Sequence, residues 1–245
     1  MPPITPASVR LPLPAPQAVT ETSALLWTPD EDLGREGVVL APGAGTTIAH
    51  ATLSGIAEGL SARGFPVLAF NFGYAEAGRR APDPMPRLLT AFAHAAGAAR
   101  DLMGGRPVVL GGRSMGGRVA SLLVAGGEPA SGLLLLNYPL HRPGKGGERA
   151  AADLRSDHWP QIRVPVLFCV GDRDPMCDLD LLERERRARL NAAPSEVHVA
   201  VGADHSLRVR RRDPRSSDEV LSEVVDVAAG WLERLPVSAG GADRP

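Results

Sequence analysis

PVVLGGRSMGGRVASLL, residues 107–123, contains a short apolar run, a glycine-rich turn and the beginning of a helical pattern. Within the turn, Gly112, Ser114 and Gly116 form the pattern Gly-x-Ser-x-Gly. A serine at the tip of a sharp strand-to-helix turn has a strained backbone, and the residues two positions away must be small. The helix start behind it favours developing negative charge. The stretch therefore predicts a nucleophilic Ser114; the alternative is a glycine-rich turn with an incidental serine.

The rest of the chain repeats this alternation of apolar runs and helical patterns. Apolar runs predict strands at residues 38–41, 67–70, 108–110, 133–136, 164–170 and 197–201. Amphipathic patterns predict helices at 50–63, 86–102, 115–125 and 217–235, and a helix that follows an N-cap at Asp178 and ends near 191. Continuous apolar runs indicate strands buried on both faces. We therefore expect a single α/β domain, a mostly parallel sheet with helices on both faces.

The predicted α/β domain spans residues 21–235. A Pro-rich segment at 1–20 is expected to be extended or partly disordered, and a small, polar tail at 236–245 is expected to be flexible. Many of the 27 glycines and 23 prolines fall at the joints between predicted elements, so they punctuate turns and do not signal general disorder.

Charge and cysteine content exclude several classes of protein. Lys145 is the one lysine among 27 basic residues, which are balanced by 28 acidic ones, so no general binder of nucleic acid or membrane surfaces is indicated. No signal peptide or membrane span is visible, which predicts a cytoplasmic protein. Cys169 and Cys177 lack zinc spacing and are expected to be one buried strand thiol and one loop thiol. We expect no metal and no organic cofactor.

A serine hydroxyl needs a base, and His205 is the best candidate among six histidines. It follows the last predicted strand directly, in the segment 202–206, at the carboxyl edge of the sheet that also carries Ser114. Open α/β sheets bind ligands at this edge. His94 falls in a helical pattern and His198 in a strand pattern, so both are expected to be structural.

The base needs a carboxylate that orients its ring. Asp172 and Asp174 both follow the strand that ends near Gly171, at the same edge. Asp174 is favoured because it lies farther from the strand end, while Asp172 is expected to cap the loop. Asp204 adjoins His205 in sequence and is expected to be a turn residue.

Two backbone N–H groups are expected to form the oxyanion hole. One belongs to Met115, directly after the serine, and the other to Ala44 in the glycine-containing loop after the first predicted apolar run. Gly43 in this loop lets the backbone approach a substrate.

Six segments together resemble the α/β-hydrolase superfamily over about residues 20–235. They are residues 42–45, 70–74, 112–117, 138–145, 171–175 and 204–206. More narrowly, the chain resembles the small hydrolases related to testis-expressed protein 30 and to a subunit of a eukaryotic histone-acetyltransferase complex, and more distantly it resembles dienelactone hydrolases. The resemblance implies a single-domain α/β-hydrolase fold with Ser114, Asp174 and His205 as the triad. Pro42 stands where the family usually has a histidine, and dienelactone hydrolases use a cysteine nucleophile.

The surroundings of the expected site are rich in arginine. The connection 137–163 is too short for a large cap domain, so we expect an open or loop-covered site. Predicted substrate contacts are Gly43, Tyr74, Arg113 and His141. Cationic and polar side chains at the same edge predict either a solvated surface or a positive rim that attracts an anionic substrate: Arg79, Arg80, Arg142, Lys145, Arg155, His158, Arg208, Arg210, Arg211, Arg212 and Arg215.

These observations predict a carboxylesterase- or thioesterase-like serine hydrolase that cleaves a small ester or thioester through an acyl-enzyme. It is expected to act as a monomer or homodimer, with a small-molecule substrate and no nucleic-acid or membrane partner. Two alternatives remain. One is a hydrolase-fold interaction module with weak or no turnover. The other is perhydrolysis or haloperoxidase-like side chemistry by the same triad.

Overall fold

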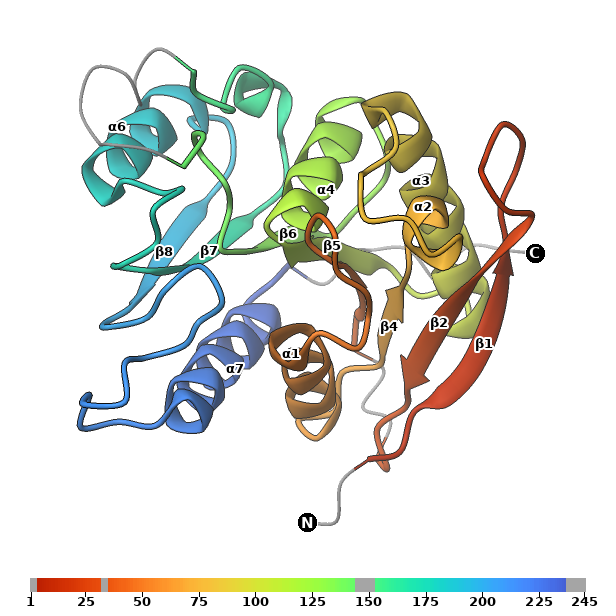
Figure 1. Ribbon diagram of the computed structural model, residues 1–245, viewed down its shortest axis with the longest axis horizontal. Helices are drawn as coiled ribbons and strands as arrows, with labels where there is room; N and C mark the ends of the chain where they lie inside the picture. Colours follow the sequence, from red (N-terminus) through yellow and green to blue (C-terminus); the bar gives the residue numbers. More distant parts are fainter. Residues whose placement is uncertain (1–3, 32–34, 144–152, 237–245) are drawn as a thin grey trace.

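The computed structural model describes residues 4–31, 35–143 and 153–236, and its centre is an eight-stranded sheet (Figure 1). The strand order within these residues is β1-β2-β4-β3-β5-β6-β7-β8. From β4 to β8 all neighbours are parallel, whereas β1 and β2 are antiparallel additions at one side. The strands are β1 (Ala7–Pro12), β2 (Glu21–Trp27), β3 (Gly37–Ala41), β4 (Val67–Phe70), β5 (Val108–Arg113), β6 (Gly132–Leu136), β7 (Val166–Gly171) and β8 (Ser195–Ala200).

Helices cover both faces of this sheet (Figure 1). They are α1 (Ala51–Ser61), α2 (Gly73–Glu76), α3 (Met85–Leu102), α4 (Met115–Ala125), the 3₁₀ turn η1 (Trp159–Gln161), α6 (Leu179–Arg189) and α7 (Ser217–Glu233). Helices α1 and α7 pack on one face, and α3, α4 and α6 on the other. No helix in the described part of the chain is long and apolar enough to cross a membrane.

The central strands are buried on both faces, as their continuous apolar sequences predicted. In β3, Val38 and Leu40 belong to the core under α1 and α7, while Val39 belongs to the core under α3 and α4. All three side chains are fully buried. Each predicted strand and helix is present, with ends that differ by a few residues, and Asp178 caps α6 by accepting a hydrogen bond from the N–H of Leu181 at 3.0 Å.

The N-terminal hairpin of β1 and β2 was not predicted. Strand β1 lies inside the Pro-rich segment and forms an edge of the sheet, where Pro12 is tolerated because an edge strand does not use every N–H. The sheet therefore begins before residue 21. The predicted tail lies, apart from Pro236, outside the described residues.

Both cysteines are free and buried. Cys169 is the predicted strand thiol in β7, and burial raises its pKa to about 12. Cys177 lies in the loop before α6, and burial together with the charges of Asp174 and Asp178 raises its pKa. These thiols are therefore protonated at neutral pH.

Glu76 of α2 connects both strands of the hairpin to the segment that follows β4. Its carboxylate accepts hydrogen bonds from Arg10 (2.6 Å), Ser23 (2.8 Å) and Asn71 (3.2 Å). Burial alone would raise the pKa of Glu76, but these hydrogen bonds lower it to about 2. The stabilisation from this depressed pKa is complete above the unfolded value near 4.5 and is lost as the pH falls toward 2.

We expect Glu76→Gln to be less stable than wild type at pH 7. The difference in their free energies of unfolding should shrink by up to about 3 kcal/mol between pH 5 and pH 2, because only the wild-type carboxylate is protonated in that range. Urea unfolding of both proteins across this range measures the effect. A difference that does not change with pH would contradict the assignment.

The sheet order also determines where a ligand site can form. The chain crosses from β3 to β4 on one side and from β4 back to β5 on the other side of β3, so the strand order reverses between β3 and β5. Ligands bind outside the carboxyl ends of strands at such a reversal. The loops after β3, β5, β6, β7 and β8 all emerge at this edge.

Candidate active site

Ser114 occupies the turn between β5 and α4, with φ 52° and ψ −114°. The turn packs against the end of β3 without room for a side chain two residues before or two residues after the serine. A Cβ atom at Gly112 would lie 2.3 Å from the carbonyl oxygen of Ala41, and one at Gly116 would lie 2.1 Å from the same oxygen. These contacts explain why the positions two residues before and two residues after the serine are glycine.

Backbone hydrogen bonds hold this strained turn. The N–H of Ser114 donates to the carbonyl of Leu136 at the end of β6 (2.8 Å), and the carbonyl of Ser114 accepts from the N–H of Arg118 (3.1 Å). The turn is thus fixed between the neighbouring strand and the first turn of α4.

The His205 ring lies between Ser114 and Asp174. Its Nε2 is 2.8 Å from the Ser114 Oγ, and its Nδ1 is 2.7 Å from the Asp174 Oδ2. A carboxylate only accepts, so Nδ1 carries the proton and Nε2 accepts from the serine hydroxyl. The Asp174 side chain is fully buried, whereas 21% of the His205 side chain is exposed. The structure therefore brings together three side chains predicted from three separate strand ends.

Asn137 is a part of this arrangement that the sequence analysis missed. It follows β6 directly and has a φ of 49°. Its side-chain amide donates to the Asp174 Oδ2 (3.3 Å) and to the carbonyl of Asp204 (3.2 Å). The other oxygen of Asp174 accepts from the N–H of Met176 at 2.8 Å. A polar residue directly after an apolar strand was the available signal.

The two other carboxylates have the loop roles that were predicted. Asp172 accepts a hydrogen bond from the N–H of Gly202 at 2.7 Å. Asp204 accepts from the N–H groups of Ser206 (2.8 Å) and Arg208 (3.1 Å), as a turn residue does. Both therefore shape the loops that carry Asp174 and His205.

The loop after β3 approaches Ser114 closely. A Cβ at Gly43 would lie 3.5 Å from the Ser114 Cβ, and the carbonyl of Gly43 accepts from the N–H (3.2 Å) and hydroxyl (2.9 Å) of Thr46. The next residue, Ala44, is exposed. Met115 begins α4, so its N–H has no acceptor one turn back in the helix. Both predicted oxyanion donors thus belong to segments that adjoin Ser114.

Tyr74 and His141, predicted as substrate contacts, are buried and bonded within the protein. The Tyr74 hydroxyl accepts from the N–H of Gly45 at 3.1 Å and supports the loop after β3. The His141 Nε2 accepts from the N–H of Asp178 at 3.0 Å and supports the segment between Asp174 and α6. The Tyr74 side chain is fully buried, and His141, at 3% exposure, lines a hollow of about 450 Å³ together with Asp174.

Arg113, also predicted as a substrate contact, is bonded within the protein. It is 7% exposed, and its Nη2 donates to the carbonyl (3.0 Å) of His205 and the hydroxyl (2.9 Å) of Ser206. Its Nη1 lies 2.7 Å from the position that a Cβ at Gly43 would occupy. Burial lowers the pKa of Arg113. Arg113 therefore connects the turn of Ser114 to the His205 loop and is not available to a substrate.

His50 is a further histidine beside the site. It precedes α1, and its pKa is lowered by burial and then by the charges of Arg113, Arg208 and His205. Nearby, the hydroxyl of Thr52 in α1 donates to the carbonyl of Ser206 at 2.8 Å, which fixes the His205 loop from a second side.

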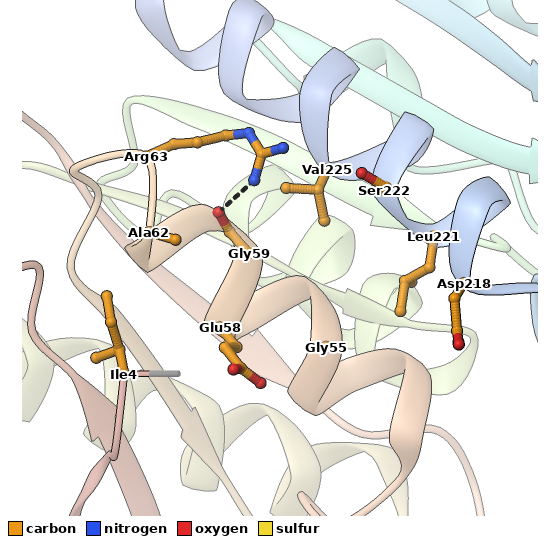
Figure 2. A pocket seen from close by; sticks show the side chains of 10 residues that line it. All are labelled: Ile4, Gly55, Glu58, Gly59, Ala62, Arg63, Asp218, Leu221, Ser222 and Val225. Atoms are coloured by element: carbon orange, nitrogen blue, oxygen red, sulfur yellow. Dashed lines mark hydrogen bonds between the residues drawn. The ribbon is translucent and has the colours of Figure 1, made fainter. Parts of the chain in front are cut away.

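A separate hollow lies between α1 and α7 (Figure 2). Gly55 and Gly59 let the helices approach: Cβ atoms there would lie 2.6 Å from Leu221 and 2.8 Å from Val225. The hollow has a volume of about 360 Å³ and contains none of the residues around Ser114. In the described ranges no group of three His, Cys, Asp or Glu side chains is arranged to hold a metal ion.

Known structures share this fold. An alpha-beta serine hydrolase homologue from Coxiella burnetii is 15% identical, with a TM-score of 0.69 over 93% of this chain and 98% of that one. A serine hydrolase without a lid from Xanthomonas campestris is 18% identical, with a TM-score of 0.67 over 96% and 98%. Dienelactone hydrolase from Anabaena variabilis is 18% identical, with a TM-score of 0.66 over 94% and 99%. At these identities the likeness shows the fold alone.

The described part of the connection between β6 and β7 contains η1 and irregular chain, with no large cap, as predicted.

Residues 34–233 match the sequence model of the alpha/beta hydrolase domain. This match covers most of the chain and agrees with the sheet order and the serine turn. The protein therefore belongs to the alpha/beta hydrolase family.

Proposed function

We propose that this protein is a serine hydrolase that cleaves a small ester or thioester through an acyl-enzyme. The observation that carries the proposal is the line of contacts from the Ser114 Oγ to the His205 Nε2 (2.8 Å) and from the His205 Nδ1 to Asp174 (2.7 Å). The structural relatives described as serine hydrolases support this reading.

The first half of the reaction acylates the serine. The Ser114 Oγ attacks the substrate carbonyl carbon while the His205 Nε2 takes the hydroxyl proton. The Asp174 carboxylate stabilises the imidazolium that forms. The backbone N–H groups of Met115 and Ala44 donate to the oxyanion. The tetrahedral intermediate collapses as His205 gives its proton to the leaving oxygen or sulfur.

The second half releases the acyl group. Water enters where the leaving group departed, and His205 takes its proton as the water oxygen attacks the acyl carbon. Collapse of the second tetrahedral intermediate returns the proton to the Ser114 Oγ and frees a carboxylic acid. The partial exposure of His205 gives water the access that this step requires.

An anionic substrate fits the loop that follows His205. Four exposed arginines there form no ion pair with any described residue: Arg208, Arg210, Arg211 and Arg212. Such a rim raises the local concentration of anions and is screened by salt. Turnover of an anionic ester should fall in raised salt while that of a neutral ester does not. An equal salt response of the two esters would contradict the proposed positive rim.

A cytoplasmic location and a monomeric or dimeric state remain predictions.

A panel of short-chain 4-nitrophenyl esters and matching thioesters tests the activity. The proposal expects turnover of at least one short acyl chain by the purified, folded protein. If no ester or thioester is cleaved, the alternative of an interaction module without turnover is favoured instead.

Arg113→Met is expected to lower kcat on the best panel ester by on the order of 10²-fold with little change in KM, because the His205 ring loses its alignment and not its contact with substrate. Arg113→Lys should restore part of the rate. Steady-state kinetics on purified variants measures both effects.

The matched control is Arg173→Met, since Arg173 also donates to a backbone carbonyl, that of Gly202 at 3.0 Å. We expect this variant to keep kcat within about threefold of wild type, as its bond does not reach the His205 backbone. Equal losses in Arg113→Met and Arg173→Met would indicate a general loss of loop stability.

A further inference from the structure

Arg118 of α4 is an arginine beside the site that has no acidic partner. It lies one helical turn after Ser114 and is half-buried. Its Nε is buried and has no hydrogen-bond partner, and its guanidinium forms no ion pair in the described ranges. Long side chains on a helix lean toward its N-terminus, so the Arg118 side chain leans toward the turn that holds Ser114.

Arg155 and His158 come next to Arg118 from the connection between β6 and β7. The His158 Nε2 lies 2.8 Å from the hydroxyl of Ser121, and that hydroxyl donates to the carbonyl of Arg118 (2.9 Å). The hydroxyl of Tyr138 donates to the carbonyl of Arg155 at 2.5 Å. The first bonds fix His158 against α4, and the last one ties the backbone of Arg155 to Tyr138 after β6. Arg118, Arg155 and His158 are termed the basic cluster below.

Among the described residues, Arg118 and Arg155 form no ion pair with a carboxylate, and Asp153 acts on Arg155 less strongly than the like charge of Arg118 does. Burial and then the charge of Arg118 lower the pKa of His158 to about 4, so this ring is neutral at pH 7. The same two causes lower the pKa of Arg155. The nearest carboxylates in sequence pair elsewhere: Asp153 with Arg142 (2.8 Å) and Asp157 with Arg189 (3.6 Å).

Two partly buried guanidinium groups without a carboxylate are unfavourable, and an anion between them removes the cost. A guanidinium presents donors in a planar fork that matches the two oxygens of a carboxylate. His158 is neutral at pH 7, so the positive charge of the basic cluster comes from Arg118 and Arg155. A negatively charged ligand group would therefore complete the basic cluster.

We propose that Arg118 and Arg155 form a subsite for a carboxylate at the far end of the substrate, which makes the preferred substrates half-esters of short dicarboxylic acids. This inference rests on the proposed hydrolase function. The N–H of Arg118 donates to the carbonyl of Ser114 at 3.1 Å, so Arg118 adjoins the turn that carries the nucleophile, which favours a short acyl chain between the ester and the carboxylate.

Two esters that differ in one carboxylate test the subsite: mono-4-nitrophenyl glutarate and 4-nitrophenyl butyrate. Wild type should have a kcat/KM at least about tenfold higher for the glutarate. Arg118→Met should lower kcat/KM for the glutarate by about 10–100-fold, the range of a charged hydrogen bond, and that for the butyrate by less than about threefold. Arg155→Met should act in the same direction.

The matched control is Arg187→Met, which removes an arginine whose side chain is 75% exposed on α6. It should leave the ratio of the two esters unchanged. The butyrate rate and a thermal melt report on folding of each variant. Equal losses on both esters, or no change in their ratio, would overturn the subsite while leaving the hydrolase function standing.

Failure of the function itself gives a different result. If folded wild type cleaves neither these two esters nor any member of the ester and thioester panel, the proposed function is overturned, and binding of glutarate then decides the subsite. Titration by calorimetry should show glutarate binding to wild type and not to Arg118→Met. Absence of binding to wild type, or equal binding to both, would overturn the subsite.

Discussion

Ser114→Ala is expected to lower kcat for a cleaved panel ester by on the order of 10⁴- to 10⁶-fold. The variant lacks the oxygen that attacks the substrate, and the residual rate comes only from binding and the oxyanion donors. Alanine keeps the Cβ atom and leaves the glycine contacts with the end of β3 unchanged, so the fold should be retained. Initial rates of both proteins, with thermal melts as the folding control, measure the effect.

Retention of more than about one hundredth of the wild-type rate in Ser114→Ala would show that another group is the nucleophile. The esters would then be cleaved elsewhere or by general base catalysis alone. His205 would then be the next residue to test, because its ring is the base at the reacting centre whichever group attacks the substrate.

Asp174→Asn is expected to lower kcat by on the order of 10³- to 10⁴-fold with a small change in KM. An amide offers no charge to the imidazolium, and its NH₂ group favours the tautomer that leaves Nε2 protonated and unable to take the serine proton. The fully buried position of the Asp174 side chain, 2.7 Å from the ring, makes this loss large. Steady-state kinetics at pH 7 and 8 measures it.

Asp172→Asn is the matched control, since the sequence leaves two aspartates after the same strand as candidates. Asp172 accepts a hydrogen bond from Gly202 and has a loop role, so its amide variant should stay within about fivefold of wild type. A larger loss in Asp172→Asn than in Asp174→Asn would reverse the assignment.

The parallel core and the strand ends were predictable from the sequence for a physical reason. Strands buried on both faces must be apolar throughout, and the helices between them must show a single apolar stripe. Parallel strands place all their carboxyl ends at one edge. Residues in the loops after strands, such as Ser114 after β5 and His205 after β8, could therefore be brought together without knowing a single contact.

Side-chain direction at that edge was not predictable. Tyr74 and His141 follow strands as Ser114 does, but packing turns them inward to support loops. Arg113 adjoins Ser114 in sequence, yet its guanidinium is committed to the backbone of His205. Strand β1 was missed because an edge strand needs only partial burial and tolerates proline, which reads as an irregular segment.

The most direct test of the account is covalent labelling with a fluorophosphonate, which reacts with an activated serine hydroxyl. Wild type should gain one phosphonyl group, and mass spectrometry of its peptides should locate this group on Ser114, with no label on Ser114→Ala. Absence of label on the folded wild-type protein, or a label that persists in Ser114→Ala, would contradict the claim that Ser114 is the nucleophile.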